Sequence, residues 1–404
     1  MGRFVKKLKK RLRRFLRRPW AKWVLLGSLV PVLALVVLLA LLPAETPDKP
    51  PVGSHNTTTI TLLAGGDLNI TDKTVASGEK GGVYDYTGAF LDVAELFATA
   101  DGAMLNLEGT LCGAPYGSST SAPLAMAQAL SACGVDFLQT ANSCSIQNGL
   151  IGLRQTLSNL RSCGMTPLGT FEDQSDFNRQ KGFVLRNIGG VKVALVAFTK
   201  GMDGMGLPDG SEDCVNLLYT DYTTTYKKIN TQGITDILEA VENAKPDITI
   251  ALLHWGSEGN TAISPSQNKI AKLMFSLGVD AIIGSHSHQV QSVVYDEKNH
   301  TLVAYSLGDF YGDGAVSGSY YSILLELQIT KDLDTGVTTL TGWDYIPLYI
   351  TTPERDDAQM KVLQIKRAME LFENNHISSV SEQTYENMKA ALAQIEKRIQ
   401  PPAE

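Results

Sequence analysis

Five side chains with metal-binding chemistry follow short apolar runs of the sequence. Asp67 ends the run in AGGD, Glu108 ends the run in NLEG, and His254 follows ALL in ALLHWG. His286 and His288 follow the run AIIGS in IIGSHSH, so three of the six histidines of the chain lie in only two such positions. In open α/β sheets, ligands bind beyond the carboxyl ends of the strands. The five residues are therefore candidates for one site.

A set of carboxylates and imidazoles suits a divalent metal ion. Imidazole favours zinc, iron or nickel, and carboxylate adds manganese and magnesium, so the set predicts one or two ions but does not distinguish Mn, Zn, Fe or Mg. A carboxylate can bridge paired ions, which activate water for attack on phosphorus or a carbonyl. His286 and His288 share one face if the strand continues, whereas in a loop they could serve different ions.

Each residue also has an ordinary structural interpretation when it is taken alone. An Asp after Gly-Gly is usually a turn or cap residue. The Glu of NLEG would be solvated or paired, and a histidine after a strand is more often hydrogen-bonded than bound to metal. Their occurrence together at successive strand ends favours a site.

The elements around these residues predict an α/β fold. From Thr59, short apolar runs alternate with helical patterns such as residues 89–100, 124–133 and 150–163, which is typical of βαβ units around a buried sheet. FVLRNI and VKVALVAFT, joined by Gly-Gly, predict a hairpin, and SILLELQIT and TTLTGWDYIPL predict another around DLDTG. Two such series predict two sheets packed face to face, with helices outside. We place this domain at 59–351 and a tail with two helical pieces at 352–404.

The N-terminal part predicts a membrane anchor. Residues 23–42 are uncharged and apolar over about the ~20 residues that a spanning helix needs. Residues 1–22 carry eleven Lys and Arg residues, which favour a cytoplasmic N-terminus and an extracytoplasmic domain. Residues 43–58 are rich in proline and polar side chains and predict a linker. The chain is thus expected to be a single-pass protein of the cell membrane, with cleavage near residues 43–45 as the alternative.

The composition of the chain indicates a folded protein and limits which partners are expected. Apolar residues make up 44% of the chain and charged residues 19%, which favours a folded protein. Beyond residue 22 the chain holds 24 basic and 42 acidic residues, a net charge of −18, so nucleic acid is not an expected partner. The five cysteines contain no CxxC pair; most are expected to be small buried residues, with one or two disulfides left open.

AGGD, NLEG, HWGSE, GSHSHQVQ and YSLGDF resemble the motif series of the poly-γ-glutamate capsule-biosynthesis (CapA) family, from about Thr59 to Thr351. That family is similar to the calcineurin-like metallophosphatases, so the resemblance implies a four-layer α/β/β/α sandwich of two mixed sheets. By the same resemblance, Asp67 and His288 would bind a first metal, and His254 and His286 a second. Glu108 would bridge the two.

The resemblance also implies catalytic roles for His254, His288 and Glu258, the carboxylate of HWGSE. An anchor for the following loop is the alternative role for Glu258. Asn69 lies where relatives often carry a histidine ligand. Asp309 replaces the more usual Asn of the family and could orient a site histidine.

One segment departs from the family pattern. ANSCSIQNG, residues 141–149, has Ser143, Cys144 and Gln147 where the family has Asn, His and Asp. Loss of a general acid costs about 10²–10⁴ in rate. The departure predicts an attenuated or altered site, with one metal rather than two.

Two functions follow from the sequence. The first is an anchored metal-dependent hydrolase of the phosphoesterase type, which acts on an anionic envelope polymer or a phosphoester in poly-γ-glutamate or other capsule biosynthesis. The alternative is a non-catalytic protein with a degenerate metal site that binds the polymer or supports membrane-bound synthase subunits.

Overall fold

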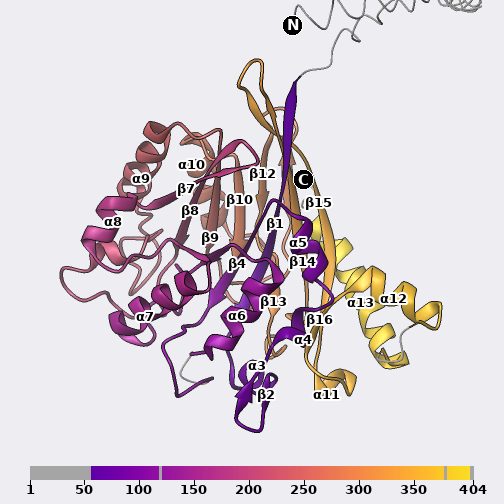
Figure 1. Cartoon of the computed structure of the whole chain (residues 1–404). Helices are drawn as coiled ribbons and strands as arrows, with labels where there is room; N and C mark the ends of the chain where they lie inside the picture. Colours follow the sequence, from indigo (N-terminus) through magenta and orange to yellow (C-terminus); the bar gives the residue numbers. More distant parts are fainter. Residues whose placement is uncertain (1–55, 118–120, 377–379, 401–404) are drawn as a thin grey trace, which may run out of the picture. The chain divides into compact units, whose positions relative to one another are not determined.

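Two β-sheets carry the fold of the computed structural model, which describes residues 56–117, 121–376 and 380–400 (Figure 1). The first sheet has eight strands and includes β13 (Asp309–Tyr311), which pairs with β1. The order of its other strands is β16 (Lys361–Gln364), β15 (Thr338–Thr351), β14 (Tyr321–Asp332), β1 (Thr57–Asn69), β4 (Gly102–Glu108), β5 (Phe137–Gln139) and β6 (Thr166–Leu168).

The second sheet has six strands. Their order is β11 (Val293–Asp296), β12 (Thr301–Ala304), β10 (Ala281–Ser285), β9 (Ile248–His254), β8 (Val191–Thr199) and β7 (Phe183–Ile188). Both sheets contain parallel and antiparallel pairs: β1, β4, β5 and β6 run parallel, as do β8, β9, β10 and β12, whereas the outer hairpins are antiparallel. The predicted α/β fold with mixed sheets is confirmed.

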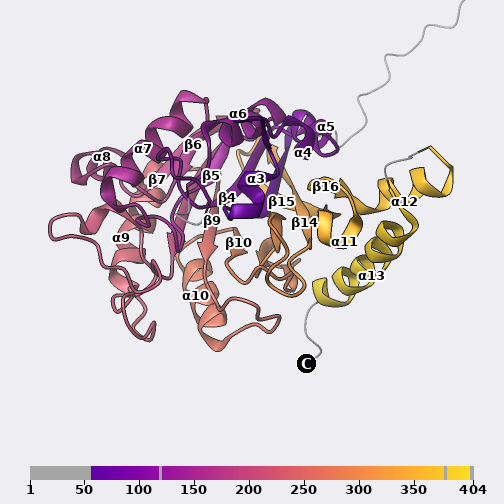
Figure 2. The ribbon, with the colours of Figure 1, turned by 90° about the horizontal axis from the view of Figure 1, so that it is seen from below.

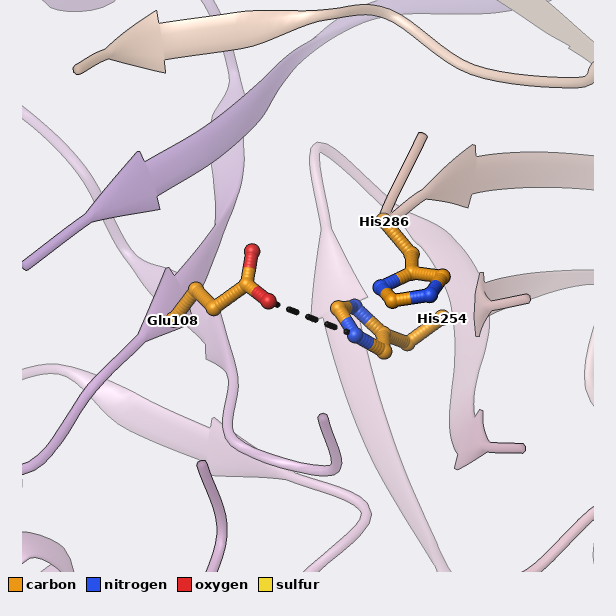
Figure 3. Close-up of side chains that lie close together, drawn as sticks. All are labelled: Glu108, His254 and His286. Carbon is orange, nitrogen blue, oxygen red and sulfur yellow. Dashed lines mark ion pairs between the residues drawn. The ribbon is translucent and has the colours of Figure 1, made fainter. Parts of the chain in front are cut away.

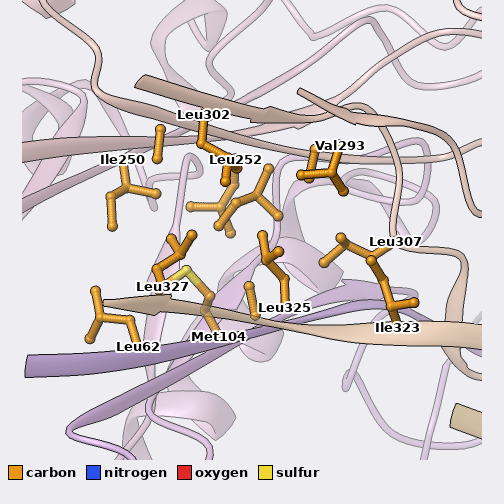
Figure 4. Packing of buried hydrophobic residues seen from close by; sticks show 14 of the residues in the cluster. Leu62, Met104, Ile250, Leu252, Val293, Leu302, Leu307, Ile323, Leu325 and Leu327 are labelled. Atoms are coloured by element: carbon orange, nitrogen blue, oxygen red, sulfur yellow. The ribbon is translucent and has the colours of Figure 1, made fainter. Parts of the chain in front are cut away.

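The inner faces of the two sheets enclose one hydrophobic core (Figure 4). Leu62, Met104 and Leu325 project from the first sheet toward Ile250 and Leu252 of the second. Because successive side chains of a strand point to opposite faces, the alternate residues of β9 pack on the helices outside. Burial on both faces explains why β9 is mostly apolar along its whole length, with Thr249 as the one polar residue before His254.

Helices cover the outer faces of both sheets. α6 (Leu124–Cys133) packs on the first sheet, and α9 (Thr231–Ala244) and α10 (Pro265–Ser276) pack on the second (Figure 2). The helix predicted over residues 89–100 forms as two pieces, α4 (Thr87–Phe90) and α5 (Ala94–Thr99). A tight turn between them lets Phe90 and Phe97 both contact the ring of Phe310, each with ring centroids 5.7 Å apart.

The tail contributes to the same core. β16 extends the first sheet beyond β15, whereas the sequence indicates only helices in this region. The short run KVLQ forms a strand because it pairs with β15. α12 (Ile365–Glu373) and α13 (Glu382–Ile399) place Ala368, Met388 and Ile395 in the inter-sheet cluster. Both helices lie beside β15 (Figures 1 and 2).

The predicted hairpins are present. β7 and β8 pair through Gly189 and Gly190, whose φ angles of 54° and 90° suit a turn that follows the twist of the strands. β14 and β15 form the second hairpin. All five cysteines are free thiols, but only Cys133 and Cys214 are buried and the other three are half-buried, so the expectation that most are buried is met by two of them.

The predicted basic segment 1–22, the anchor 23–42 and most of the linker 43–58 lie outside the described residues. The strand β1 begins at Thr57, inside the predicted linker. Within the ranges that the structure describes, no helix combines the length and the apolar character needed to cross a membrane.

Leu325 tests the inter-sheet core. The side chain is fully buried, so Leu325→Ala should lower the free energy of unfolding by about 2–5 kcal/mol in urea denaturation. The control, Leu333→Ala, removes a side chain that is 48% exposed and should change it by less than about 0.5 kcal/mol. Equal effects of the two substitutions would contradict the described core.

Candidate metal centre

The ends of four parallel strands bring the five predicted ligands together. Asp67 lies at the end of β1 and Glu108 at the end of β4, while His254 ends β9. β10 ends at Ser285, so His286 and His288 lie in the loop beyond it. The five side chains are at most about 6% exposed, although they are polar. Burial of so many polar groups in one place is costly unless each finds a partner.

The first group consists of Glu108, His254 and His286 (Figure 3). Oε1 of Glu108 lies 3.5 Å from Nε2 of His254, and the rings of His254 and His286 are 4.4 Å apart between centroids. One ligand atom from each residue can be chosen so that all three atoms lie within 4.8 Å of one another. The carboxylate thus faces two imidazoles at the spacing that a metal ion requires.

The same three residues hold buried polar atoms without a hydrogen-bond partner. These atoms are Oε2 of Glu108, Nε2 of His254 and Nδ1 of His286. A buried acceptor or donor left unsatisfied costs about 1–3 kcal/mol. Three such atoms in one cluster fit a bound divalent ion, which would satisfy Oε2 of Glu108 and Nε2 of His254, and also Nδ1 of His286 in the tautomer that places the ring proton on Nε2.

Hydrogen bonds orient the imidazole of His254. Its Nδ1 lies 3.2 Å from Oγ of Ser285, its partner across the β9–β10 register. In the tautomer that protonates Nδ1, this nitrogen donates to Ser285 and Nε2 presents its lone pair to the cluster. Such a second contact fixes both the tautomer and the ring of a metal ligand.

The second group consists of Asp67, His288 and Asp309. Nδ1 of His288 donates to Oδ1 of Asp309 at 2.7 Å, which is the orienting contact predicted for Asp309. Nδ1 of His288 also lies 3.7 Å from Oδ2 of Asp67, and Nε2 lies 3.7 Å from Oε2 of Glu108. His288 therefore connects the two groups, and Glu108 stands between them.

The backbone of the histidine loop is strained. His286 and His288 have φ angles of 87° and 55°, a region that residues other than glycine rarely adopt and that costs about 1–3 kcal/mol for each. The amide of His286 donates to Oδ2 of Asp67 at 3.0 Å, which holds the loop to β1. The loop thus resolves the question left open by the sequence, because the two rings do not follow one strand.

Burial controls the charges of the centre. It raises the pKa of Asp67 to about 6 and that of Glu108 to about 8, and it lowers the pKa of His254 and His286 well below the usual value. Burial also opposes the charging of His288, but Asp309, Glu108 and Asp67 outweigh it and raise its pKa well above the usual value. An ion that binds there would displace protons.

The segment that departs from the family pattern borders the centre. Oγ of Ser143 donates to Oε1 of Glu108 at 2.7 Å. Burial, and then the charge of Glu108, raises the pKa of the Cys144 thiol. Because its proton is held so firmly, Cys144 is a poor general acid. The amide of Asn142 bonds to Asn106 and to the carbonyl of Leu107, so Asn142 is committed to the scaffold.

Glu258 and Gln147 lie apart from this cluster. Glu258 is on an exposed turn beyond β9, outside both candidate ligand groups. Gln147 is also exposed, and Asn69 is half-buried at the end of β1. The catalytic role of Glu258 stays a prediction.

Lys200 and Asn106 also belong to the centre, although the sequence did not predict them. Nζ of Lys200 lies 2.9 Å from Nε2 of His286 and donates to the carbonyl of Gly256 at 3.2 Å. Lys200 directly follows β8, as the other residues follow their strands, but a lone lysine in that position carries no metal-binding signal. Nδ2 of Asn106 donates to Oδ1 of Asp67 at 2.6 Å. Its position two residues before Glu108, on the same face of β4, was the available signal.

Comparison with known proteins identifies the family. Residues 61–314 match the sequence model of the bacterial capsule synthesis protein PGA_cap family. The chain belongs to this family. The PGA_cap match covers all five predicted ligands, Asp309 and Lys200, and it ends before the C-terminal helices.

Two relatives of this PGA_cap protein are capsule or PGA biosynthesis proteins. The chain is 24% identical over 355 residues to the capsule biosynthesis protein CapA of Bacillus anthracis. This match covers 86% of the chain and 79% of the relative. The chain is also 25% identical over 227 residues to the PGA biosynthesis protein CapA of Bacillus subtilis (strain 168). This second match covers 56% of the chain and 55% of the relative.

Solved structures with low similarity include phosphatases. A novel phosphatase from Mycoplasma pneumoniae is 14% identical with a TM-score of 0.47, over 74% of this chain and 96% of that chain. The calcineurin-like phosphoesterase YfkN from Bacillus subtilis is 16% identical with a TM-score of 0.42, over 84% of this chain and 97% of that chain.

Lys200 tests the electrostatics of the centre. Its ammonium group is a like charge beside any bound cation, so Lys200→Met should tighten metal binding by about tenfold in competition with a chelator. Lys227→Met removes an exposed charge of the same loop and should leave the affinity unchanged. Weaker binding by Lys200→Met would mean that its contact with His286 supports the site more than its charge opposes the ion.

Proposed function

We propose that this protein acts in the synthesis of a bacterial capsule or envelope polymer, poly-γ-glutamate or a related anionic chain, through a metal-dependent hydrolase centre of the phosphoesterase type. The observation that carries the proposal is the buried triplet of Glu108, His254 and His286, each with an unpartnered polar atom. Membership of the PGA_cap family supports the polymer, and the two CapA relatives support capsule synthesis.

The chain's own residues divide the work of such a centre. Glu108, His254 and His286 would hold a divalent ion, with His288 and Asp67 as ligands of a second position. The bound ion would act as a Lewis acid and activate water. Asp309 orients His288 through Nδ1, and Ser285 orients His254 in the same way. Lys200 adds a positive charge at His286, on the side of Gly256.

A second candidate is a non-catalytic role in polymer binding or in support of a membrane-bound synthase. The observation that favours it is Cys144, whose thiol stands where the family has an acid histidine and whose raised pKa makes it a poor proton donor. Both candidates use the same bound metal, and they differ in turnover.

We further propose that the domain is extracytoplasmic and tethered by residues 23–42. The uncharged apolar sequence of this segment and the basic residues before it support this location. Membrane-bound synthase subunits and the anionic polymer are then the expected partners, because both are present at that surface.

His254 tests whether the centre binds metal. The purified full chain, loaded with excess divalent metal and freed of unbound ion, should retain one or two equivalents by elemental analysis. His254→Ala should lose at least one equivalent, because it removes a ligand from the triplet. His300→Ala alters an exposed histidine of the β11–β12 turn and should keep the wild-type content. Retention of all the metal by His254→Ala would contradict the proposed metal centre.

Substitutions in residues 141–149, where the chain departs from the family pattern, test whether the centre is catalytic. The double substitution Ser143→Asn with Cys144→His should raise hydrolysis of a generic phosphodiester by about 10²-fold or more, because it supplies an amide ligand and a general acid. The same protein with His254→Ala added serves as the metal-site control and should lose the gain. No gain in a folded, metal-loaded double variant would favour the non-catalytic role.

A further inference from the structure

The last helix of the described chain contacts the histidine loop of the centre. Nη1 of Arg398, near the end of α13, donates to Oε1 of Gln289 at 2.9 Å. Gln289 directly follows His288 and is buried. These two residues are 109 positions apart, and Arg398 lies well beyond the region that matches the family.

The side chain of Gln289 is fixed on several sides. Its Nε2 donates to the carbonyl of Ser317 at 2.7 Å, while Oε1 accepts from Arg398. A Cβ atom at Gly318 would come within 2.6 Å of the same Oε1, so this position is closely filled. The backbone of Gln289 is held as well, because its amide donates to Oγ of Ser287 at 3.2 Å. Movement of Gln289 would therefore move the loop that carries His288.

Contacts other than the one with Gln289 also hold the side chain of Arg398 in place. Its guanidinium group lies over the ring of Tyr321, 5.2 Å from the centroid, and the ring belongs to the inter-sheet core. Ile395 and Ile399 on either side of Arg398 are buried in the same core. A planar guanidinium held by an aromatic face loses little freedom when it donates a hydrogen bond.

The loop that carries His286 and His288 depends on contacts that fix its backbone. His286 and His288 both hold left-handed backbone conformations, which persist only where the surroundings determine them. On one side, Asp67 holds the amide of His286. On the other side, Gln289 is the next residue after His288, and its side chain is anchored to Ser317 and α13.

We propose that Arg398 is a positioning residue of the metal centre, which acts through Gln289 to hold His288 in place. The C-terminal helix α13, which lies beyond the residues that match the family, is then an integral part of the site. The inference about loop geometry stands by itself, and its effect on metal affinity rests on the proposed function.

Two measurements on the full chain test the inference, with Arg398→Met as the variant and Lys397→Met, an exposed neighbour on α13, as the control. Hydrogen exchange of metal-free protein, followed by mass spectrometry, should be at least about fivefold faster for Arg398→Met in peptides that cover residues 285–291. Strands β9 and β8 should exchange as in the wild type. The affinity for metal should fall by about 10–100-fold, as expected when an outer contact of a ligand is lost.

The outcomes are distinct. Faster exchange confined to the α13 peptides, with an unchanged histidine loop, would overturn the inference and leave Arg398 a stabilising residue of the helix. A wild-type chain that binds no metal would refute the proposed function, and the exchange of residues 285–291 would still decide the role of Arg398.

A double-mutant cycle removes the remaining ambiguity. Gln289→Ala should speed the exchange of the loop at least as much as Arg398→Met, because it also removes the bond to Ser317. Adding Arg398→Met to Gln289→Ala should have little further effect, because Arg398 acts on the loop only through Gln289. Multiplicative effects in the double variant would show that the two residues act separately, and would contradict the inference.

Discussion

Three unpaired polar atoms in the protein interior are the constraint on which the rest of this structure depends. Glu108, His254 and His286 are buried, and each has one polar atom without a hydrogen-bond partner among the described residues, a costly arrangement that a bound ion would relieve. The two sheets supply the rigidity that holds them. Their parallel strands end at one edge, and the hydrophobic core between the sheets fixes the distance across it.

Around this triplet, neighbouring groups control where protons reside. Ser285 and Asp309 each bind the Nδ1 of one histidine, so the Nε2 atoms are directed toward Glu108. Burial raises the pKa of Glu108 to about 8, and Ser143 occupies one of its oxygens. The centre thus gathers residues that could bind a cation, and burial raises the pKa of the Cys144 thiol beside them.

The sequence predicted much of this arrangement because the strand-end rule is local. Asp67, Glu108, His254 and the two loop histidines each follow an apolar run, and the structure brings all five together. Lys200 obeys the same rule but was missed, because a lone lysine after a strand carries no metal-binding signal. Gln289 and Arg398 could not be paired from sequence, since a contact across 109 positions depends on tertiary packing. β16 was missed for the same reason, because only its pairing with β15 makes it a strand.

The most direct test of the central claim is the position of a bound ion. A crystal of the metal-loaded protein, measured on both sides of the absorption edge of that metal, should show an anomalous peak among Glu108, His254 and His286. At such a position Nε2 of His254 would be a ligand at about 2.0–2.1 Å for zinc. An anomalous peak only elsewhere on the protein, with these three side chains still unpartnered, would contradict the account.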